Sequence, residues 1–230
     1  PAEQVKVTYE AEDTDASWNA SSATAVVLNG TSIEVLGGGA TTSGSVLTIT
    51  AAGGYVLSGT LDDGQIIIDA DKKDTVRLVL NGVTLHCSNC APIYAKQADK
   101  TILTLAEGTT NTVTDGDSYT YADAEAEEPD AAIFCKDDLT INGSGSLSVT
   151  GNFNNGIGTK DNLIVVAGAI SVIAANDGLR GRDSVAIKGG GITIDAGADG
   201  IKSNNDEDTA KGYVAIDGGE LSITAGNDGI

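Results

Sequence analysis

Asn154-Asn155-Gly156-Ile157 opens a phrase that the sequence states three more times, as Asn176-Asp177-Gly178-Leu179, Ala198-Asp199-Gly200-Ile201 and Asn227-Asp228-Gly229-Ile230. The glycines of successive phrases are 22, 22 and 29 residues apart, and the last interval is one period of 22 plus an insertion of 7. A fixed period in the twenties is typical of a solenoid, in which each coil buries its apolar side only against neighbouring coils. The repeat therefore decides the fold class before any single element is considered.

Each clear coil continues from the phrase into two short apolar strands separated by a glycine-rich turn. After Lys160-Asp161 comes Leu163-Ile164-Val165, and after Arg182-Asp183 comes Val185-Ala186-Ile187, followed by the turn Gly189-Gly190-Gly191. Short alternating apolar runs with Asn-Gly, Asp-Gly and Gly-Gly turns also fill residues 25 to 105. The 22-residue register favours parallel stacking over hairpins, with equivalent residues about 4.8 Å apart. We therefore predict an all-β parallel β-helix with coils of about 22 residues.

The solenoid is expected to occupy residues 25–230, with an N-terminal cap over its first coil at residues 1–24. Two acidic insertions interrupt the coils, near residues 115–130 and 203–211, and long insertions on a rigid scaffold commonly carry function. The chain stops inside the fourth phrase, at Ile230, where a coil would leave an open edge. We therefore expect the natural protein to continue past this residue.

The overall charge limits the classes of partner. The chain has 13 Lys and Arg against 33 Asp and Glu, which gives a net charge of −20 and a pI near 4.1. Direct binding of nucleic acid or of an anionic membrane is therefore not expected. An acidic polymer could still bind if metal ions bridged the two anionic surfaces. No run of 18 apolar residues is present, so we expect no membrane insertion.

Cysteine usage leaves several interpretations open. Cys87 and Cys90 have CxxC spacing next to His86, the single histidine, and Cys135 lies far away in the sequence. A zinc site would need a second pair of ligands, which the chain does not offer at suitable spacing. The alternatives are small buried residues or a local disulfide.

Stacking of the coils would place charged residues in two ladders. The aspartate ladder consists of Asn155, Asp177, Asp199 and Asp228, and the basic ladder consists of Lys96, Lys136, Lys160 and Arg182. Carboxylates about 4.8 Å apart repel by roughly 3 to 4 kcal/mol at an effective dielectric of 20, so a cation between them would explain their retention. Oxygen ligands on flexible turns favour calcium over magnesium. The alternative is that these residues only form exposed turns, for which Asp and Asn are common.

Further candidate ligands lie close to the ladders and in the insertions. We assign Asp161, Asp183, Asp206 and Asp208 to the candidate calcium ligands, in addition to the aspartate ladder. The regular spacing of the basic ladder suggests structural pairing with Asp161 and Asp183 or with neighbouring coils. Lys160, Arg182, Lys202, Tyr119 and Tyr121 are the candidate ligand-binding residues.

The order and spacing of these motifs resemble a known family. The stretch Ala131-Ala132-Ile133-Phe134-Cys135-Lys136-Asp137-Asp138-Leu139-Thr140-Ile141-Asn142-Gly143-Ser144-Gly145, with Asn176-Asp177-Gly178-Leu179, resembles bacterial cell-surface carbohydrate-binding β-helix proteins over roughly residues 60 to 230. That resemblance implies a right-handed, pectate-lyase-like β-helix. It also implies binding of cellulose and of acidic plant polysaccharide such as polygalacturonate or pectin, with calcium as cofactor.

Three functions follow as hypotheses. The first is a non-catalytic, calcium-dependent carbohydrate-binding protein, secreted or on a bacterial surface, monomeric, with a polysaccharide as partner. The second is a calcium-dependent pectate lyase, in which Lys160 or Arg182 would remove the proton next to the uronate carboxylate. The third is a structural or adhesive spacer. Trp18 could stack on a sugar, although packing of a cap tryptophan on the first coil is the more common arrangement.

Overall fold

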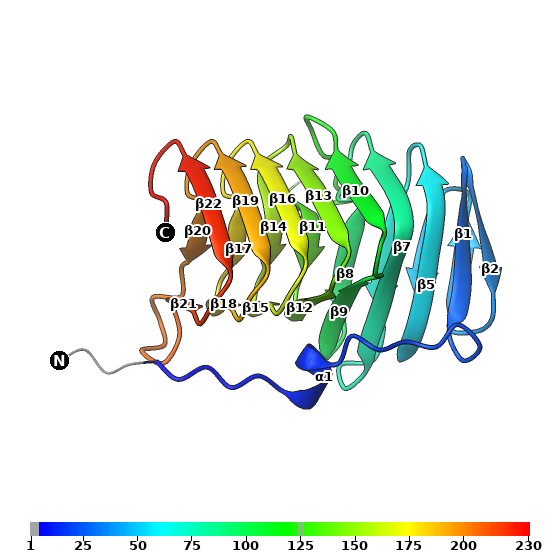
Figure 1. The fold of residues 1–230 in the computed structure, drawn as a ribbon. Helices are drawn as coiled ribbons and strands as arrows, with labels where there is room; N and C mark the ends of the chain where they lie inside the picture. Colours follow the sequence, from blue (N-terminus) through cyan, green and yellow to red (C-terminus); the bar gives the residue numbers. More distant parts are fainter. Residues whose placement is uncertain (1–4, 124, 126) are drawn as a thin grey trace.

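The chain winds into one elongated parallel β-helix (Figure 1). The structure is a computed structural model that describes residues 5–123, 125 and 127–230. Its strands form a 14-stranded and an 8-stranded sheet. The long strand β7 (Thr75–Cys87) bends so that residues 75–80 pair with β9 and residues 84–87 pair with β10. The 14-stranded sheet therefore supplies two faces of the helix, and the predicted fold class is confirmed.

Each face is a stack of parallel strands, one from each coil. The first face continues from β7 through β9 (Lys100–Leu105), β12 (Asp138–Gly143), β15 (Asn162–Val165), β18 (Ser184–Ile187) and β21 (Tyr213–Ile216). The second face contains β10 (Thr110–Asp115), β13 (Ser146–Gly151), β16 (Ala169–Ala174), β19 (Gly191–Ala196) and β22 (Glu220–Ala225). The third face is the 8-stranded sheet of β3 (Ala40–Ser43), β4 (Val46–Ile49), β6 (Gln65–Asp69), β8 (Ile93–Gln97), β11 (Ala131–Cys135), β14 (Asn155–Thr159), β17 (Leu179–Gly181) and β20 (Ile201–Ser203).

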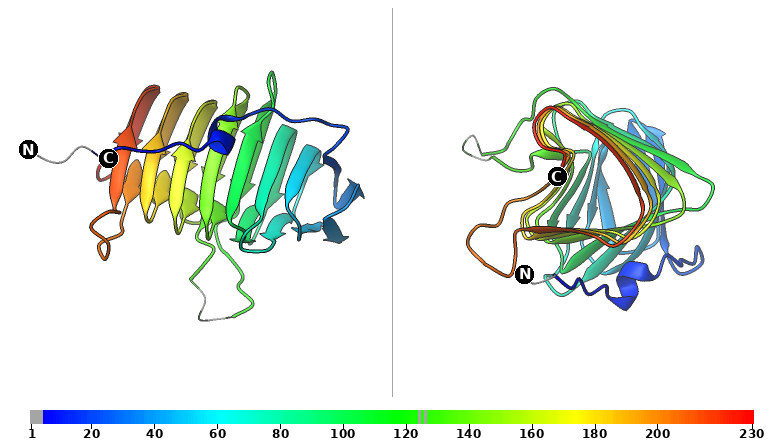
Figure 2. Two further views of the ribbon diagram at one scale, coloured as in Figure 1. Left: turned by 90° about the horizontal axis from the view of Figure 1, so that it is seen from below. Right: turned by 60° about the vertical axis from the view of Figure 1, so that its left-hand side comes forward.

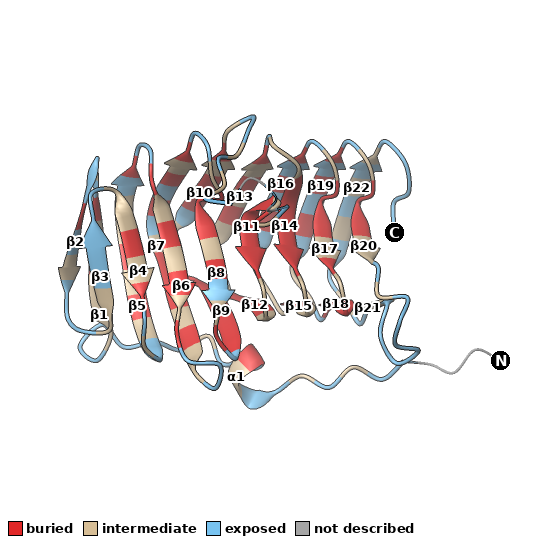
Figure 3. Ribbon diagram, turned by 180° about the vertical axis from the view of Figure 1, so that it is seen from behind, coloured by how far each residue is buried: buried red, intermediate tan, exposed pale blue. Residues whose placement is uncertain are grey.

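The core is built from apolar rows that run along the helix axis. On the third face one such row is in register across six strands, and none of its side chains is more than 1% exposed: Ile66, Ile93, Ile133, Ile157, Leu179 and Ile201. Figure 3 shows the buried positions of β11, β14 and β17 side by side. Because side chains alternate along a strand, the residues between these positions point outward. The 22-residue period thus fixes which residues form the outer surface of each coil.

The N-terminal end of the helix departs from pure parallel stacking. β1 (Thr24–Gly30) pairs antiparallel with β2 (Ser32–Leu36) and parallel with β5 (Gly53–Leu61), and β3 pairs antiparallel with β4. The expectation that parallel stacking replaces hairpins is therefore wrong for these two strand pairs. Gly30 and Gly44 have φ of 69° and 60°, which are the left-handed values that tight hairpin turns require. These turns reverse the chain before the regular coils begin.

The N-terminal strap, residues 5–23, runs along the side of the helix instead of crossing the end of its first coil (Figures 1 and 2). Its short helix α1 (Ala11–Thr14) contacts β12. Asp13 is fully buried, 3.0 Å from Lys100 Nζ, and accepts a hydrogen bond from Thr140 Oγ1. Further toward the N-terminus, Tyr9 donates a hydrogen bond to Asp217. A buried carboxylate needs a cationic partner, and Lys100 on the first face supplies it.

The cysteines form one local disulfide. Cys87 and Cys90 are bonded to each other, so neither thiolate is free to bind zinc. Cys135 is a buried free cysteine, and burial raises the pKa of its thiol to about 12. Of the helices among the described residues, none is long and apolar enough to cross a membrane.

Candidate functional site

The outward-facing positions of the third face form one continuous row, here called the outer row, in which Phe134 is itself buried and Gly158 has no side chain. It alternates with the buried row described above and is in register across six strands: Ile67, Tyr94, Phe134, Gly158, Arg180 and Lys202. The row is apolar and aromatic on β6, β8 and β11, and basic on β17 and β20. Both acidic insertions project from the same side of the molecule (Figure 2). The third face is therefore the surface on which the sequence-predicted residues gather.

An aromatic hollow lies at the apolar end of the outer row. It has a volume of about 390 Å³, and Tyr94, Tyr119 and Tyr121 are among its lining residues. Tyr119 stacks on Phe153 with ring centroids 4.2 Å apart, and its hydroxyl donates to Asp115 Oδ2 at 2.7 Å. Tyr121 donates to the carbonyl oxygen of Pro129 at 2.8 Å. The first insertion therefore folds back on β6 and β8, and brings the two predicted tyrosines together.

The phenols of this hollow are held neutral. Burial raises the pKa of Tyr119, and its hydrogen bond to Asp115 raises it further. Burial also raises the pKa of Tyr94 and of Tyr121. Tyr94 was not among the residues predicted from the sequence, because it lies inside a strand. Its alternation with buried Ile93 was the available signal that its ring faces outward.

The basic ladder is paired with acidic side chains of the insertions and of the neighbouring coil. Lys160 Nζ lies 2.7 Å from Glu128 Oε1, and Lys136 Nζ lies 3.8 Å from Glu128 Oε2. Arg182 is 2.7 Å from Glu207. Lys96 reaches back one coil to Asp69 at 2.8 Å. The expected pairing with a neighbouring coil is present at Lys96, whereas Lys160 and Arg182 pair with Glu128 and Glu207 and not with Asp161 and Asp183.

The aspartate ladder has a structural function that the sequence did not reveal. The amide of Asp177 donates to Asn155 Oδ1 at 3.1 Å, and the amide of Asp199 donates to Asp177 Oδ1 at 3.2 Å. The amide of Asp228 donates in the same way to Asp199 Oδ1 at 3.2 Å. Each ladder oxygen thus satisfies a main-chain N–H of the next coil, at a turn where no strand pairing is available. Asn can do the same, which explains why Asn155 can be the first member.

The second oxygens of the ladder face a cation supplied by the protein itself. Lys202 Nζ lies 2.7 Å from Asp199 Oδ2 and 3.6 Å from Asp177 Oδ2, and Asp177 is 1% exposed. Hydrogen bonds from Lys202 and Asn227 lower the pKa of Asp199 to about 2. The same contact with Asp199 raises the pKa of Lys202. An ammonium group of the protein itself thus lies close to the second oxygens of both Asp177 and Asp199.

A calcium ion takes six to eight oxygen ligands, and the candidate residues do not offer such a set as folded. Asp177 and Asp199 already accept main-chain N–H groups and the Lys202 ammonium. Asp183 accepts hydrogen bonds from Lys211 at 2.6 Å and from Asn205. Asp161 and Asp183 both line a hollow of about 350 Å³. Asp206 and Asp208 are exposed. No group of three or more His, Cys, Asp or Glu side chains among the described residues is arranged to hold a metal ion.

One ion pair at the centre of the face is unusually enclosed. Arg180 lies 2.9 Å from Asp130 Oδ2, and burial raises the pKa of Asp130. Among the described residues, neither Asp130 Oδ1 nor Arg180 Nε has a hydrogen-bond partner. Gly158 packs closely beside this pair, because a Cβ there would lie 3.2 Å from Ala131 Cβ and 3.9 Å from Asp130 Oδ1. The outer row, the hollow and the basic ladder together form a polar and aromatic surface suited to a hydroxyl-rich ligand.

Comparison with known proteins agrees with this surface. Residues 43–230 match the family described as carbohydrate-binding domain-containing protein. A protein of that description from Acetivibrio thermocellus is 47% identical over 126 residues, which are 55% of this chain and 44% of the relative. The chain thus spans less than half the length of this relative. A solved structure, described as the polysaccharide lyase-like protein from C. thermocellum in a gadolinium derivative, has a TM-score of 0.87 and 38% identity, and the match covers 90% of this chain and 93% of that chain. The chain belongs to the carbohydrate-binding domain-containing family.

Proposed function

We propose that this domain binds an acidic plant polysaccharide of the polygalacturonate type on its third face, without cleaving it. The carrying observation is a row of basic side chains there, each of which is paired with a carboxylate of the protein that a ligand could replace. In a chain with net charge −20, five of the 13 basic residues lie on or directly after β11, β14, β17 and β20: Lys136, Lys160, Arg180, Arg182 and Lys202. Their spacing follows the stacking of the coils, so cations recur along one axis, as carboxylates recur along a polyuronate.

The basic side chains are accessible to such a ligand. Lys136, Lys160, Arg182 and Lys202 have exposed side-chain fractions between 38% and 42%. Exposed ion pairs of this kind stabilise a protein by only about 0 to 1 kcal/mol, because water and salt compete for both partners. A uronate carboxylate can therefore replace Glu128 on Lys160, or Glu207 on Arg182, at little cost in free energy. The aromatic hollow at the other end of the row would receive uncharged ring faces of the same chain, or of cellulose.

That polysaccharide binding depends on calcium remains a prediction made from the sequence. The related solved structure is a gadolinium derivative, and gadolinium, like calcium, is a hard cation that prefers oxygen ligands. The carboxylates in the described part of the chain are not grouped to hold a metal ion, so we assign calcium no specific position. We also propose a location outside the cell, which the Cys87–Cys90 disulfide supports because disulfides persist in oxidising compartments.

The ion pairs made by the two candidate catalytic bases favour binding over lyase chemistry. A catalytic base for β-elimination needs a lowered pKa, so that it is unprotonated near neutral pH. The two candidate bases, Lys160 and Arg182, are instead engaged by Glu128 and Glu207.

Calorimetric titration with polygalacturonate tests the proposal. We expect saturable binding by the wild type and at least a tenfold loss of affinity in the triple variant Lys136→Ala, Lys160→Ala and Arg182→Ala. Lys73→Ala is the matched control, because Lys73 is 82% exposed and lies outside the third face. The same titration in the presence of a chelator tests whether binding depends on calcium. Ultraviolet absorbance of an unsaturated product tests whether the polysaccharide is cleaved. Equal affinity of the triple variant and the wild type would refute the proposed site.

A further inference from the structure

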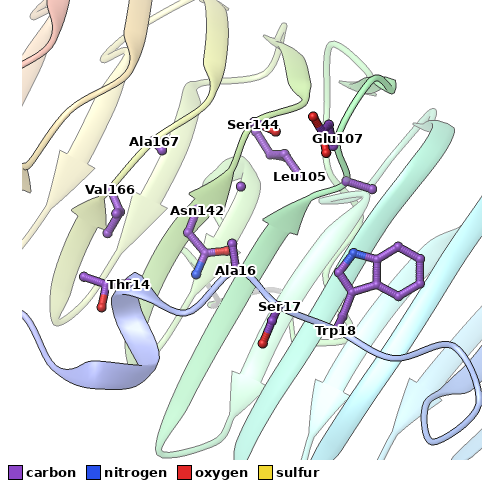
Figure 4. Close-up of a pocket in the computed structure, with 12 residues that line it drawn as sticks. Thr14, Ala16, Ser17, Trp18, Leu105, Glu107, Asn142, Ser144, Val166 and Ala167 are labelled. Carbon is purple, nitrogen blue, oxygen red and sulfur yellow. The ribbon is translucent and has the colours of Figure 1, made fainter.

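A second surface, far from the third face in the fold, surrounds the single tryptophan of the chain. Trp18 lies on the N-terminal strap, where it is 38% exposed. It lines two hollows on the first-face side, of about 490 Å³ and about 600 Å³, and Ser17 also lines both. One hollow extends over the ends of β9 and β12, and the other over β5 and β7. Figure 4 shows the indole standing beside the first hollow with the edge that carries its nitrogen turned toward Leu105 and Glu107.

The strap holds Trp18 in place through contacts on both sides of it. Asn142 on β12 donates to the carbonyl oxygens of Asp13 and Asp15 at 2.9 and 3.2 Å. The amide of Ser17 donates to Asp15 Oδ1 at 2.9 Å. After the tryptophan, Asn19 Oδ1 accepts from the amide of Ser21 at 2.9 Å. An exposed indole on a fixed backbone offers a large contact area with little loss of conformational entropy on binding.

The lining of the two hollows is almost free of charge. Among the residues that the structure describes, Glu107 is the one charged residue that lines the first hollow, and Arg77 is the one that lines the second. The Arg77 guanidinium is already engaged, because it donates to Thr104 Oγ1 at 2.7 Å and to the carbonyl oxygen of Glu12 at 3.4 Å. The remaining lining residues offer hydroxyl, amide and apolar groups. In a chain of net charge −20, this composition favours an uncharged ligand.

We propose that Trp18 is a stacking platform for a neutral oligosaccharide that lies across both hollows. The C–H groups on one face of a pyranose ring carry partial positive charge and pack against the negative face of the indole. The volumes of the hollows are in the range that small-ligand sites occupy, about 300 to 1,000 Å³. Serine and threonine hydroxyls beside the ring can exchange hydrogen bonds with the sugar hydroxyls. Trp18 precedes residues 43–230, which carry the family match, and the site is independent of the proposed acidic-glycan site.

Fluorescence provides a direct test, because Trp18 is the single tryptophan and its emission therefore reports this site alone. Titration with cellohexaose, a neutral oligosaccharide, should shift the emission maximum to shorter wavelength and reduce quenching by acrylamide, both saturably. In calorimetry, Trp18→Ala should lose at least tenfold in cellohexaose affinity, and Trp18→Phe should retain part of it because a smaller ring remains.

Two controls separate this proposal from the acidic-glycan site. Polygalacturonate affinity should be unchanged in Trp18→Ala, and the fluorescence response to cellohexaose should be unchanged in Lys160→Ala. Trp18→Phe keeps the test valid if Trp18→Ala proves unstable by thermal unfolding. Absence of any emission change on cellohexaose addition, or equal cellohexaose affinity of the wild type and a folded Trp18 variant, would overturn the proposal.

Discussion

Lys202 Nζ lies 2.7 Å from Asp199 Oδ2, and the same ammonium group is 3.6 Å from Asp177 Oδ2 in the preceding coil. One lysine therefore contacts two stacked carboxylates and offsets part of their charge, and Asp177 is almost fully buried. Without that cation the two charges would face each other at the spacing of adjacent coils. The ladder is thus a structural ion cluster at one end of the proposed binding face.

Replacing Lys202 by alanine should destabilise the protein by about 1 to 2 kcal/mol, because a buried carboxylate loses its partner while the exposure of Lys202 limits the effect. Urea unfolding followed by circular dichroism measures this change. Calcium should restore more stability to Lys202→Ala than to the wild type, because the ladder oxygens then become available. Lys73→Ala removes the exposed 3.9 Å contact with Asp71 and should leave the unfolding midpoint unchanged. An unaltered midpoint in Lys202→Ala would contradict the assigned role.

Asp13→Ala should detach the strap and destabilise the fold by about 3 kcal/mol or more, because the Lys100 ammonium stays buried after its buried partner is removed. Asp13 is fully buried and the Lys100 side chain is 5% exposed. Glu10 also contacts Lys100, at 2.6 Å, but is 64% exposed, so Glu10→Ala is the matched control and should have a much smaller effect. Thermal unfolding and limited proteolysis of the strap measure both variants. Equal effects of the two substitutions would argue against a strap anchored by Asp13.

The free energy of unfolding should first rise and then fall as the pH is lowered from 7 to 3. Burial raises the pKa of Asp130, Asp138 and Asp161 above the ordinary value, so the folded state binds protons that the unfolded state does not. Their stabilising contribution is lost as the pH rises through the folded pKa, and protonation toward pH 4 should therefore raise the free energy of unfolding. The Asp199 contribution has the opposite sign: it is present above the unfolded pKa of about 3.9 and is lost as the pH falls toward the folded pKa of about 2. Urea midpoints at pH 7, 5, 4 and 3 test this, and a continuous decrease from pH 7 would contradict it.

Gly178→Ala tests the tight stacking of the repeated turn. An added Cβ would meet Ile194 Cγ2 and would lie 2.6 Å from the carbonyl oxygen of Gly200. Overpacking of this kind destabilises by about 1 to 3 kcal/mol. Gly191→Ala is the control, because a Cβ there has no atom within 4 Å. Similar unfolding midpoints for the two variants would show that the turn can relax, against our expectation.

The repeat alone was sufficient to predict the parallel coils, because period and register are properties of the sequence. The ladder partner could not be predicted in the same way, since Lys202 belongs to the outer row and reaches two different coils. Glu128 is likewise far from Lys160 in sequence, and only the folding of the first insertion brings them together. The N-terminal strap shows the same limit, because its position depends on the buried contact between Asp13 and Lys100. Periodicity thus predicts the scaffold, while contacts made by non-repeating segments shape the site.

The exchange of carboxylates on Lys160 is the central step of the proposed binding mode, and paired calorimetry on two variants tests it most directly. Glu128 holds Lys160 at 2.7 Å and Lys136 at 3.8 Å in the free protein. Polygalacturonate should therefore bind more tightly to Glu128→Gln, which removes the competing carboxylate, and more weakly to Lys160→Ala. Opposite shifts of at least threefold in the dissociation constant are the predicted result. Weaker binding by both variants, or no change in either, would contradict the account.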